Sequence, residues 1–162
     1  MHGEKRIFCE SVIKAELKEV WKAWTTEEGI KSFFAPECKI NLVPGGVYEM
    51  YFTPESPNGT RGGEGCQVLA VQPMKMLSFT WNAPPSIPDI RNQFTHVLVR
   101  FCEHPEETHI KLFHDGWGTG PEWNQAFSYF STAWTKVVLP RLKIRFTQGP
   151  INWQNPPLLR KE

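Results

Sequence analysis

The feature that most constrains the fold is an apolar stripe in the last quarter of the chain. Large side chains recur there at the 3.6-residue period of an α-helix, at Trp123, Phe127, Phe130, Trp134, Val137 and Val138. Pro121 suits the first turn of a helix, and Thr119 with Glu122 has the spacing of a capping box. The pattern therefore predicts one amphipathic helix over residues 120–146, about 40 Å long at a rise of ~1.5 Å per residue.

The segments before this helix alternate apolar and polar residues, as strands do, and glycine or proline separates many of them. Two short helices are predicted after the first strand, because apolar residues recur there at helical spacing. The predicted strands are 6–15, 38–42, 47–53, 64–72, 76–81, 95–102 and 108–114. We expect an α+β domain in which a curved antiparallel sheet of about seven strands wraps on the long helix.

Proline and glycine set off the end of the chain from this domain. Residues 147–162 contain Gly149, Pro150, Pro156 and Pro157, which are incompatible with a continued helix. The expected organisation is therefore a single domain over residues 1–146 and an irregular tail over 147–162. Trp153 is the residue through which the tail is expected to lie across the domain.

Charge and cysteine usage exclude several classes of protein. The 18 basic residues balance 17 acidic ones and form no basic stripe, so nucleic acid is not an expected partner. No apolar run reaches the ~18 residues of a membrane span, and the N-terminus lacks an apolar signal segment. The four cysteines form no Cys-x-x-Cys pair, which argues against zinc and against a disulfide framework. We expect a cytoplasmic protein with reduced thiols.

Several segments, taken in order, resemble the START-like (SRPBCC) superfamily. Within it, the sequence is similar to the family named after the activator of the ATPase of the 90-kDa heat-shock protein. The resemblance covers about residues 6 to 146. The matching pieces are Ala15-x-x-x-x-Val20-Trp21-x-Ala23-Trp24-Thr25, Pro44-Gly45-Gly46, Gly65 through Val71 with Pro73, Leu77-x-Phe79-Thr80-Trp81, Thr108-x-Ile110-x-Leu112-x-His114, and the helix that contains Trp134.

This resemblance implies a helix-grip (START/Bet v 1-like) fold with a cavity between the long helix and the sheet. It leaves the function open, because the superfamily includes lipid carriers, hormone receptors, cyclases and co-chaperone domains. The chain departs from the family pattern at Ala133, where glycine is usual, at Pro140, and in the tail after residue 146. A proline so deep in a helix is expected to kink or weaken it.

Strand alternation and the helix stripe together predict which side chains face the cavity. Tyr48, Phe79 and Trp81 should point inward from strands, opposite the aromatic residues of the helix. His114 has the same parity at a strand end, so we expect it at the cavity mouth beside the helix start, where it could orient a ligand carbonyl. The predicted ligand-binding residues are Tyr48, Phe79, Trp81, His114, Trp123, Phe127, Phe130 and Trp134.

Few other residues in the sequence suggest metal binding or catalysis. His109 and His114 face opposite sides of one strand, and neither Ser78 nor a cysteine lies in an activating sequence context, so no metal, cofactor or catalytic residue is assigned. The first hypothesis is a small protein that binds a hydrophobic or aromatic molecule. Two alternatives remain: a cyclase- or dehydratase-like enzyme that uses the same pocket, with His114 and Asp115 or Glu64 as acid and base, and a domain that stimulates a chaperone ATPase.

The first strand carries apolar groups on both faces. Phe8 and Val12 alternate with Ile7, Cys9 and Ile13, so one apolar set should lie on the outer face of the sheet. An exposed apolar face commonly marks a contact with another chain. Homodimerisation through this face or through the tail is therefore a further hypothesis.

Overall fold

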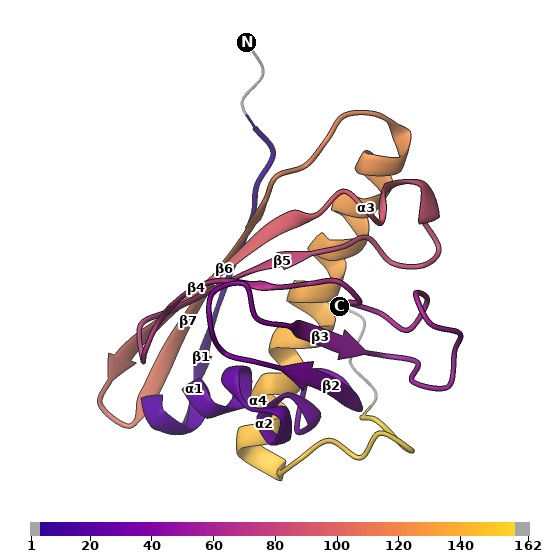
Figure 1. The fold of residues 1–162 in the computed structure, drawn as a ribbon. Coiled ribbons are helices and arrows are strands. Elements are labelled where there is room, and N and C mark those ends of the chain that lie inside the picture. Colours follow the sequence, from indigo (N-terminus) through magenta and orange to yellow (C-terminus); the bar gives the residue numbers. More distant parts are fainter. Residues whose placement is uncertain (1–3, 158–162) are drawn as a thin grey trace.

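The computed structural model describes residues 4–157, which form a mixed α+β domain (Figure 1). The elements in chain order are β1 (Ile7–Ile13), α1 (Leu17–Thr25), α2 (Glu27–Lys31), β2 (Glu37–Ile40), β3 (Tyr48–Tyr51), β4 (Val68–Gln72), β5 (Met76–Trp81), a 3-10 turn (Pro88–Ile90), β6 (Thr95–His104), β7 (Glu107–Asp115), α3 (Pro121–Thr132), a π-helical segment (Ala133–Val138) and α4 (Leu139–Gln148).

The strands divide between two sheets. Five of them form an antiparallel sheet in the order β1-β7-β6-β5-β4, and β2 pairs with β3 in a separate hairpin. Two isolated bridges, Val47 with Gln67 and Tyr51 with Gly62, join the hairpin to the segment that leads into β4 of the larger sheet. The expected seven strands are present, but not as one continuous ladder. The interruption coincides with left-handed backbone at Gly62 and Gly65, which an extended strand cannot contain.

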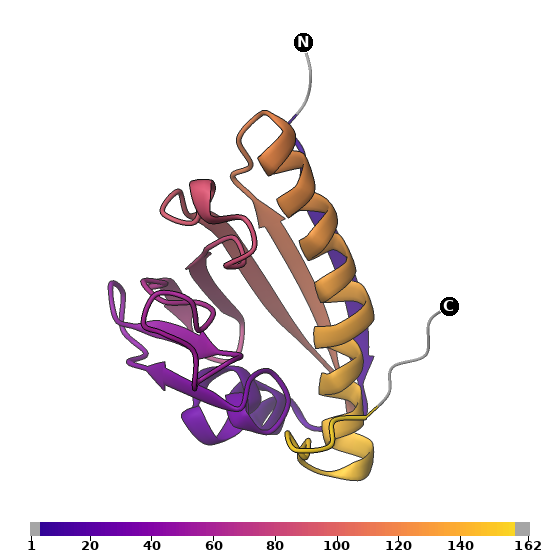
Figure 2. The ribbon, with the colours of Figure 1, turned by 90° about the vertical axis from the view of Figure 1, so that its right-hand side faces the viewer.

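The helical segments from α3 to α4 run along one side of the domain, and the five-stranded sheet curves behind them (Figure 2). The β2–β3 hairpin lies on the opposite side of the domain from these helical segments. Side chains from both layers fill the space between them, and the largest of those that are fully buried are Trp24, Trp134, Tyr48, Phe33 and Phe79. The predicted burial of Trp134 is confirmed, since only 1% of its surface is exposed.

The long helix differs from the prediction in two local details. Gly120 occupies the N-cap and no side chain caps it, so the predicted Thr119–Glu122 capping box is wrong. Helical turns continue past Pro140, but the hydrogen bonds widen to π spacing just before it: the Leu139 N–H donates to the carbonyl of Trp134. Proline has no N–H, so at Pro140 a regular α-helix would lose one of its backbone hydrogen bonds. The wider hydrogen-bond spacing just before Pro140 lets the helix continue past it.

The segment after α4 lies against α2. The Ile151 N–H donates to the Ser32 carbonyl at 2.9 Å, and the indole Nε1 of Trp153 donates to the Lys31 carbonyl at 2.6 Å. Residues 158–162, the end of the predicted tail, lie outside the described residues. Within residues 4–157, none of the helices combines the length and the apolar character needed to cross a bilayer.

Candidate functional site

A cleft of about 900 Å³ opens between the long helix and the loops that follow β3 and β5. One wall comes from the helix, which contributes residues 128–130, 132–134, 137, 138 and 141. The other wall comes from the loops, with residues 52, 53, 60–62 and 81–86, and Phe34 lies between the two walls. Its volume falls within the ~300–1,000 Å³ of sites that hold small molecules.

Aromatic rings form the apolar part of the cleft. The ring centroids of Trp81 and Trp134 are 6.0 Å apart, and Phe34 lies 5.7 Å from each of them. Phe52 packs edge-on to Trp81 at 6.5 Å and is 42% exposed, while Tyr129 on the helical wall is 50% exposed. The cleft therefore combines a buried aromatic floor with aromatic side chains at its rim that remain about half exposed.

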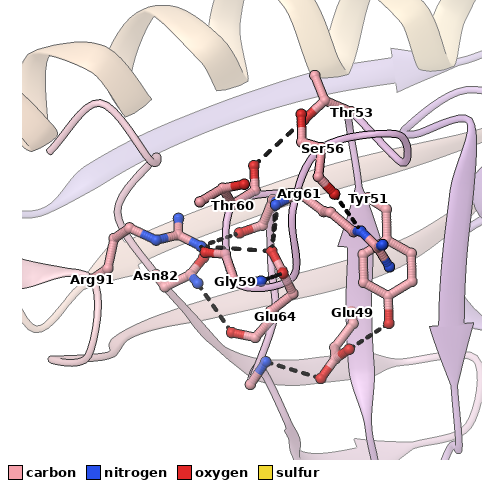
Figure 3. Close-up of polar contacts among 12 residues, drawn as sticks. Glu49, Tyr51, Thr53, Ser56, Gly59, Thr60, Arg61, Glu64, Asn82 and Arg91 are labelled. Carbon is pink, nitrogen blue, oxygen red and sulfur yellow. Dashed lines mark hydrogen bonds and ion pairs between the residues drawn. The ribbon is translucent and has the colours of Figure 1, made fainter. Parts of the chain in front are cut away.

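A partly buried carboxylate and a partly buried guanidinium hold the loop wall in place (Figure 3). The Glu64 carboxylate accepts the backbone N–H groups of Gly59, Arg61 and Gly62, and it lies 3.7 Å from the Arg91 guanidinium. The Arg91 guanidinium donates to the carbonyl of Ala83 at 2.5 Å and to those of Gly59 and Gly62. This pair ties the loop after β3 to the loop after β5.

His114 lies behind the cleft floor, not at a mouth, and has no exposed surface. The Trp134 indole Nε1 donates to Nδ1 of His114 at 3.0 Å, so the ring proton is on Nε2, which donates to the Thr95 hydroxyl at 2.7 Å. The Thr95 hydroxyl in turn donates to the Trp81 carbonyl at 3.1 Å. Burial, with a smaller contribution from the charge of His96, lowers the pKa of His114 to about 3. The imidazole is thus neutral and fully bonded.

The other seven predicted site residues fall into three groups. Trp81, Phe130 and Trp134 line the cleft. Tyr48 and Phe79 are fully buried and pack against each other with tilted rings whose centroids are 4.6 Å apart, and the Tyr48 hydroxyl donates to the Trp24 carbonyl. Trp123 and Phe127 pack around Trp117 nearer the start of α3, with ring centroids 6.4 and 5.2 Å from it. A ligand contact by any of the predicted residues stays a prediction.

Sequence reasoning did not single out several residues that line the cleft. Phe34, Phe52 and Tyr129 contribute rings, and Arg141 contributes a guanidinium. The parity of Phe52, which it shares with Tyr48, did indicate an inward direction. Tyr129 lies outside the apolar helix stripe, so the stripe gave no signal for it. Arg141 continues the spacing of the stripe, seven residues after Trp134, but as a charged residue it was not counted among the apolar members.

Ser78, His96 and Asp115 form a polar group on the opposite sheet face from the cleft. Ser78 Oγ lies 2.8 Å from Nε2 of His96, whose Nδ1 lies 3.0 Å from the Asp115 carboxylate. The connectivity is that of a catalytic triad, but β5 is an interior strand, so its N–H groups lie in the sheet plane. They cannot point at an acyl oxygen above Ser78, so the backbone of β5 offers this group no oxyanion hole. We assign it a role in joining β5, β6 and β7.

The long helix, the curved antiparallel sheet and the cleft between them define a helix-grip domain. The chain belongs to the family described as Activator of Hsp90 ATPase homolog 1-like protein, whose sequence profile matches residues 14–147. Comparison with curated proteins finds no significant match.

Solved structures share this fold. Protein MLL2253 from Mesorhizobium loti superposes with a TM-score of 0.68 at 22% identity, over 86% of this chain and 94% of that one. The Aha1 dimer from Colwellia psychrerythraea gives 0.68 at 22% identity, over 90% and 98%. CalU16 from Micromonospora echinospora gives 0.65 at 22% identity, over 92% and 78%. At these identities the likeness shows the fold alone.

Proposed function

We propose that the protein binds a small hydrophobic or aromatic molecule in the cleft between the long helix and the loops after β3 and β5. The observation that carries this proposal is the aromatic cleft of about 900 Å³, at whose rim Phe52 and Tyr129 are about half exposed. Exposing large rings to water is unfavourable by ~25 cal/mol per Å², so a ligand that covers them gains binding free energy. The proposed ligand is a flat apolar molecule that lies between the loop wall and the helical wall.

The cleft supports binding better than acid–base catalysis. None of the residues that line it is aspartate, glutamate or histidine, and both nitrogens of His114 are already bonded behind the floor. A cyclase or dehydratase would need a group that can exchange a proton with the ligand at near-neutral pH. The enzyme alternative therefore lacks an aspartate, glutamate or histidine to carry it among the residues that line the cleft.

A matched pair of threonines on the helix tests the proposal. Thr132 lines the cleft, whereas Thr135, three residues further on, is exposed and does not. Thr132→Trp should fill the cleft and abolish binding of the neutral dye N-phenyl-1-naphthylamine, measured by its fluorescence, whereas Thr135→Trp should bind it as the wild type does. Dye binding that is equal in all three proteins, or absent from all three, would contradict the proposal.

We further propose that the protein self-associates through the outer face of the sheet. Phe8 on β1 is 50% exposed and packs on Phe113 of β7 with ring centroids 5.0 Å apart, and Leu98 of β6 is the next residue across the ladder. Such a row of apolar side chains on three neighbouring strands suits contact with a second copy of the chain.

A cytoplasmic location is also proposed, because the described cysteines are unpaired, as they are in a reducing compartment. They are Cys9, Cys38, Cys66 and Cys102.

A further inference from the structure

We infer that the ligand of the cleft carries an anionic group, and that the guanidinium of Arg141 binds it. This inference rests on the proposed binding function and specifies the chemical class of the ligand: an apolar body with one anionic headgroup. It follows from the charges that line the cleft, from the hydrogen bonds that Arg141 does not make, and from the way the chain holds this side chain.

The charged residues on the cleft wall are all of one sign. Arg61 and Arg141 both line the cleft, and none of the other lining residues is acidic. The Arg61 side chain has a protein partner, since its Nε donates to the Ser56 carbonyl at 2.8 Å. Arg141 has no such acceptor among the described residues. A positive potential inside a largely apolar cleft favours a ligand of opposite charge.

Arg141 is poised to donate hydrogen bonds. Its Nε is shielded from solvent and has no hydrogen-bond partner among the described groups. Burial also lowers its pKa from the ordinary arginine value, although a guanidinium remains charged near neutral pH. A buried donor without an acceptor is unfavourable, and a carboxylate or a similar anion supplies the acceptor oxygens in a geometry that matches the planar guanidinium.

The tail holds this guanidinium without satisfying it. The Trp153 ring lies 5.3 Å from Cζ of Arg141, and the Trp153 indole is itself bonded to the Lys31 carbonyl. An aromatic face attracts a cation but offers no lone pair to its N–H groups. Trp153 therefore restricts the guanidinium to the end of the cleft while leaving its donors free for a ligand.

Arg145, one helical turn later, provides the contrast. It also has a buried Nε without a partner, and it lies over the ring of Phe146 at 5.1 Å. It lines a different hollow, however, whose wall carries charges of both signs, Glu19 and Glu28 together with Lys22 and Lys31. The charged residues on the wall of the cleft, in contrast, are all cationic. Arg145 is therefore a matched control, because its substitution changes the net charge equally without touching the cleft.

Two dyes that differ by one anionic group test the inference. 8-Anilino-1-naphthalenesulfonate is N-phenyl-1-naphthylamine with an added sulfonate. Arg141→Met, which keeps an apolar stem, should weaken binding of the sulfonate dye about tenfold or more and change binding of the neutral dye less than about twofold. Arg145→Met should change neither. Equal loss of both dyes in Arg141→Met, or an unchanged affinity for the sulfonate dye, overturns the inference.

A displacement experiment on the wild type needs no variant to fold. Dodecanoate should displace the neutral dye at a concentration about tenfold or more below that of dodecanol if the ligand is a fatty acid, and 2-naphthoate should outcompete 2-naphthol similarly if it is an aromatic acid. Acids that compete no better than their alcohols overturn the inference but leave the binding function standing. Failure of the neutral dye to bind at all overturns the binding function itself.

Discussion

The indole of Trp134 donates to Nδ1 of His114 at 3.0 Å, and this bond makes the histidine a support for the cleft floor. Through Thr95 the same imidazole is linked to the backbone of Trp81, so one buried ring connects the two tryptophans that face the cleft. In the protein interior, a hydrogen-bond network whose donors and acceptors are all paired is rigid, and the loss of any one member lowers the stability of the fold. We regard this network as what keeps the floor in a single arrangement.

The lowered pKa of His114 predicts a pH-dependent stability. Its pKa is about 3 in the folded protein against an ordinary value of 6.5, so the unfolded chain takes up the extra proton first as the pH falls. The stability is therefore complete above about pH 6.5 and decreases from there to about pH 3, by at most about 1.4 kcal/mol per pH unit from this group. Urea unfolding at several pH values measures it.

The control for this prediction is His114→Asn, whose side-chain oxygen can still accept from Trp134 but does not titrate. Its unfolding free energy should be lower than that of the wild type at pH 7 and should fall less steeply between pH 6.5 and 4. Parallel slopes in the two proteins would mean that other groups cause the pH dependence.

Truncation of two phenylalanines should distinguish packed core from cleft wall. Phe79 is fully buried and lies away from the cleft, so Phe79→Ala should leave a void and lower the unfolding free energy by about 3–5 kcal/mol. Phe130 borders space that is already open, so Phe130→Ala should cost clearly less. Thermal and urea unfolding of both variants compare the costs, and equal costs would argue that the cleft is closed in solution.

The pair of Glu64 and Arg91 should control the order of the loop wall. Glu64→Gln weakens the acceptor of the Gly59, Arg61 and Gly62 N–H groups, and we expect those amides to exchange with solvent faster while core strands keep their protection. Hydrogen exchange measured by NMR reports each amide. Glu103→Gln, an exposed change of the same type on β6, is the control. Unchanged exchange at the three amides in Glu64→Gln would show that the backbone orders this loop without the carboxylate.

Self-association predicts a sensitivity to charge on the outer face of the sheet. Phe8→Glu should convert a dimer into a monomer in sedimentation, because the carboxylate would be buried against a second copy. Glu10→Gln on the same strand face should leave the dimer intact. A wild-type protein that sediments as a monomer of 18.7 kDa at high concentration would refute the dimer.

Periodicity in the sequence is sufficient to predict the helix, the strands and the inward faces, because burial repeats at fixed intervals along each element. It does not predict how deeply a side chain is buried. His114 has the parity of a cavity residue, but Trp117 and Trp134 pack over it, with ring centroids 4.3 and 6.1 Å away. Its depth depends on these partners, of which Trp134 is far away in sequence.

Neither the loop wall nor the proposed anion-binding residue can be predicted from the sequence, for the same reason. Glu64 and Arg91 lie in separate loops that only the folded sheet brings together. Arg141 is a charged residue at the spacing of the apolar helix stripe, and only the folded chain places the cleft and Trp153 beside its guanidinium. Features that depend on contacts between distant segments leave little trace in a single sequence.

The most direct test of ligand binding in the cleft is an NMR titration that follows the indole N–H signals of the seven tryptophans. On addition of N-phenyl-1-naphthylamine, the signals of Trp81 and Trp134 should shift with a common saturation curve, because both rings line the cleft. The signal of Trp24, which lies away from the cleft, should remain in place. Shifts confined to tryptophans outside the cleft, or no shifts at saturating dye, would contradict the account.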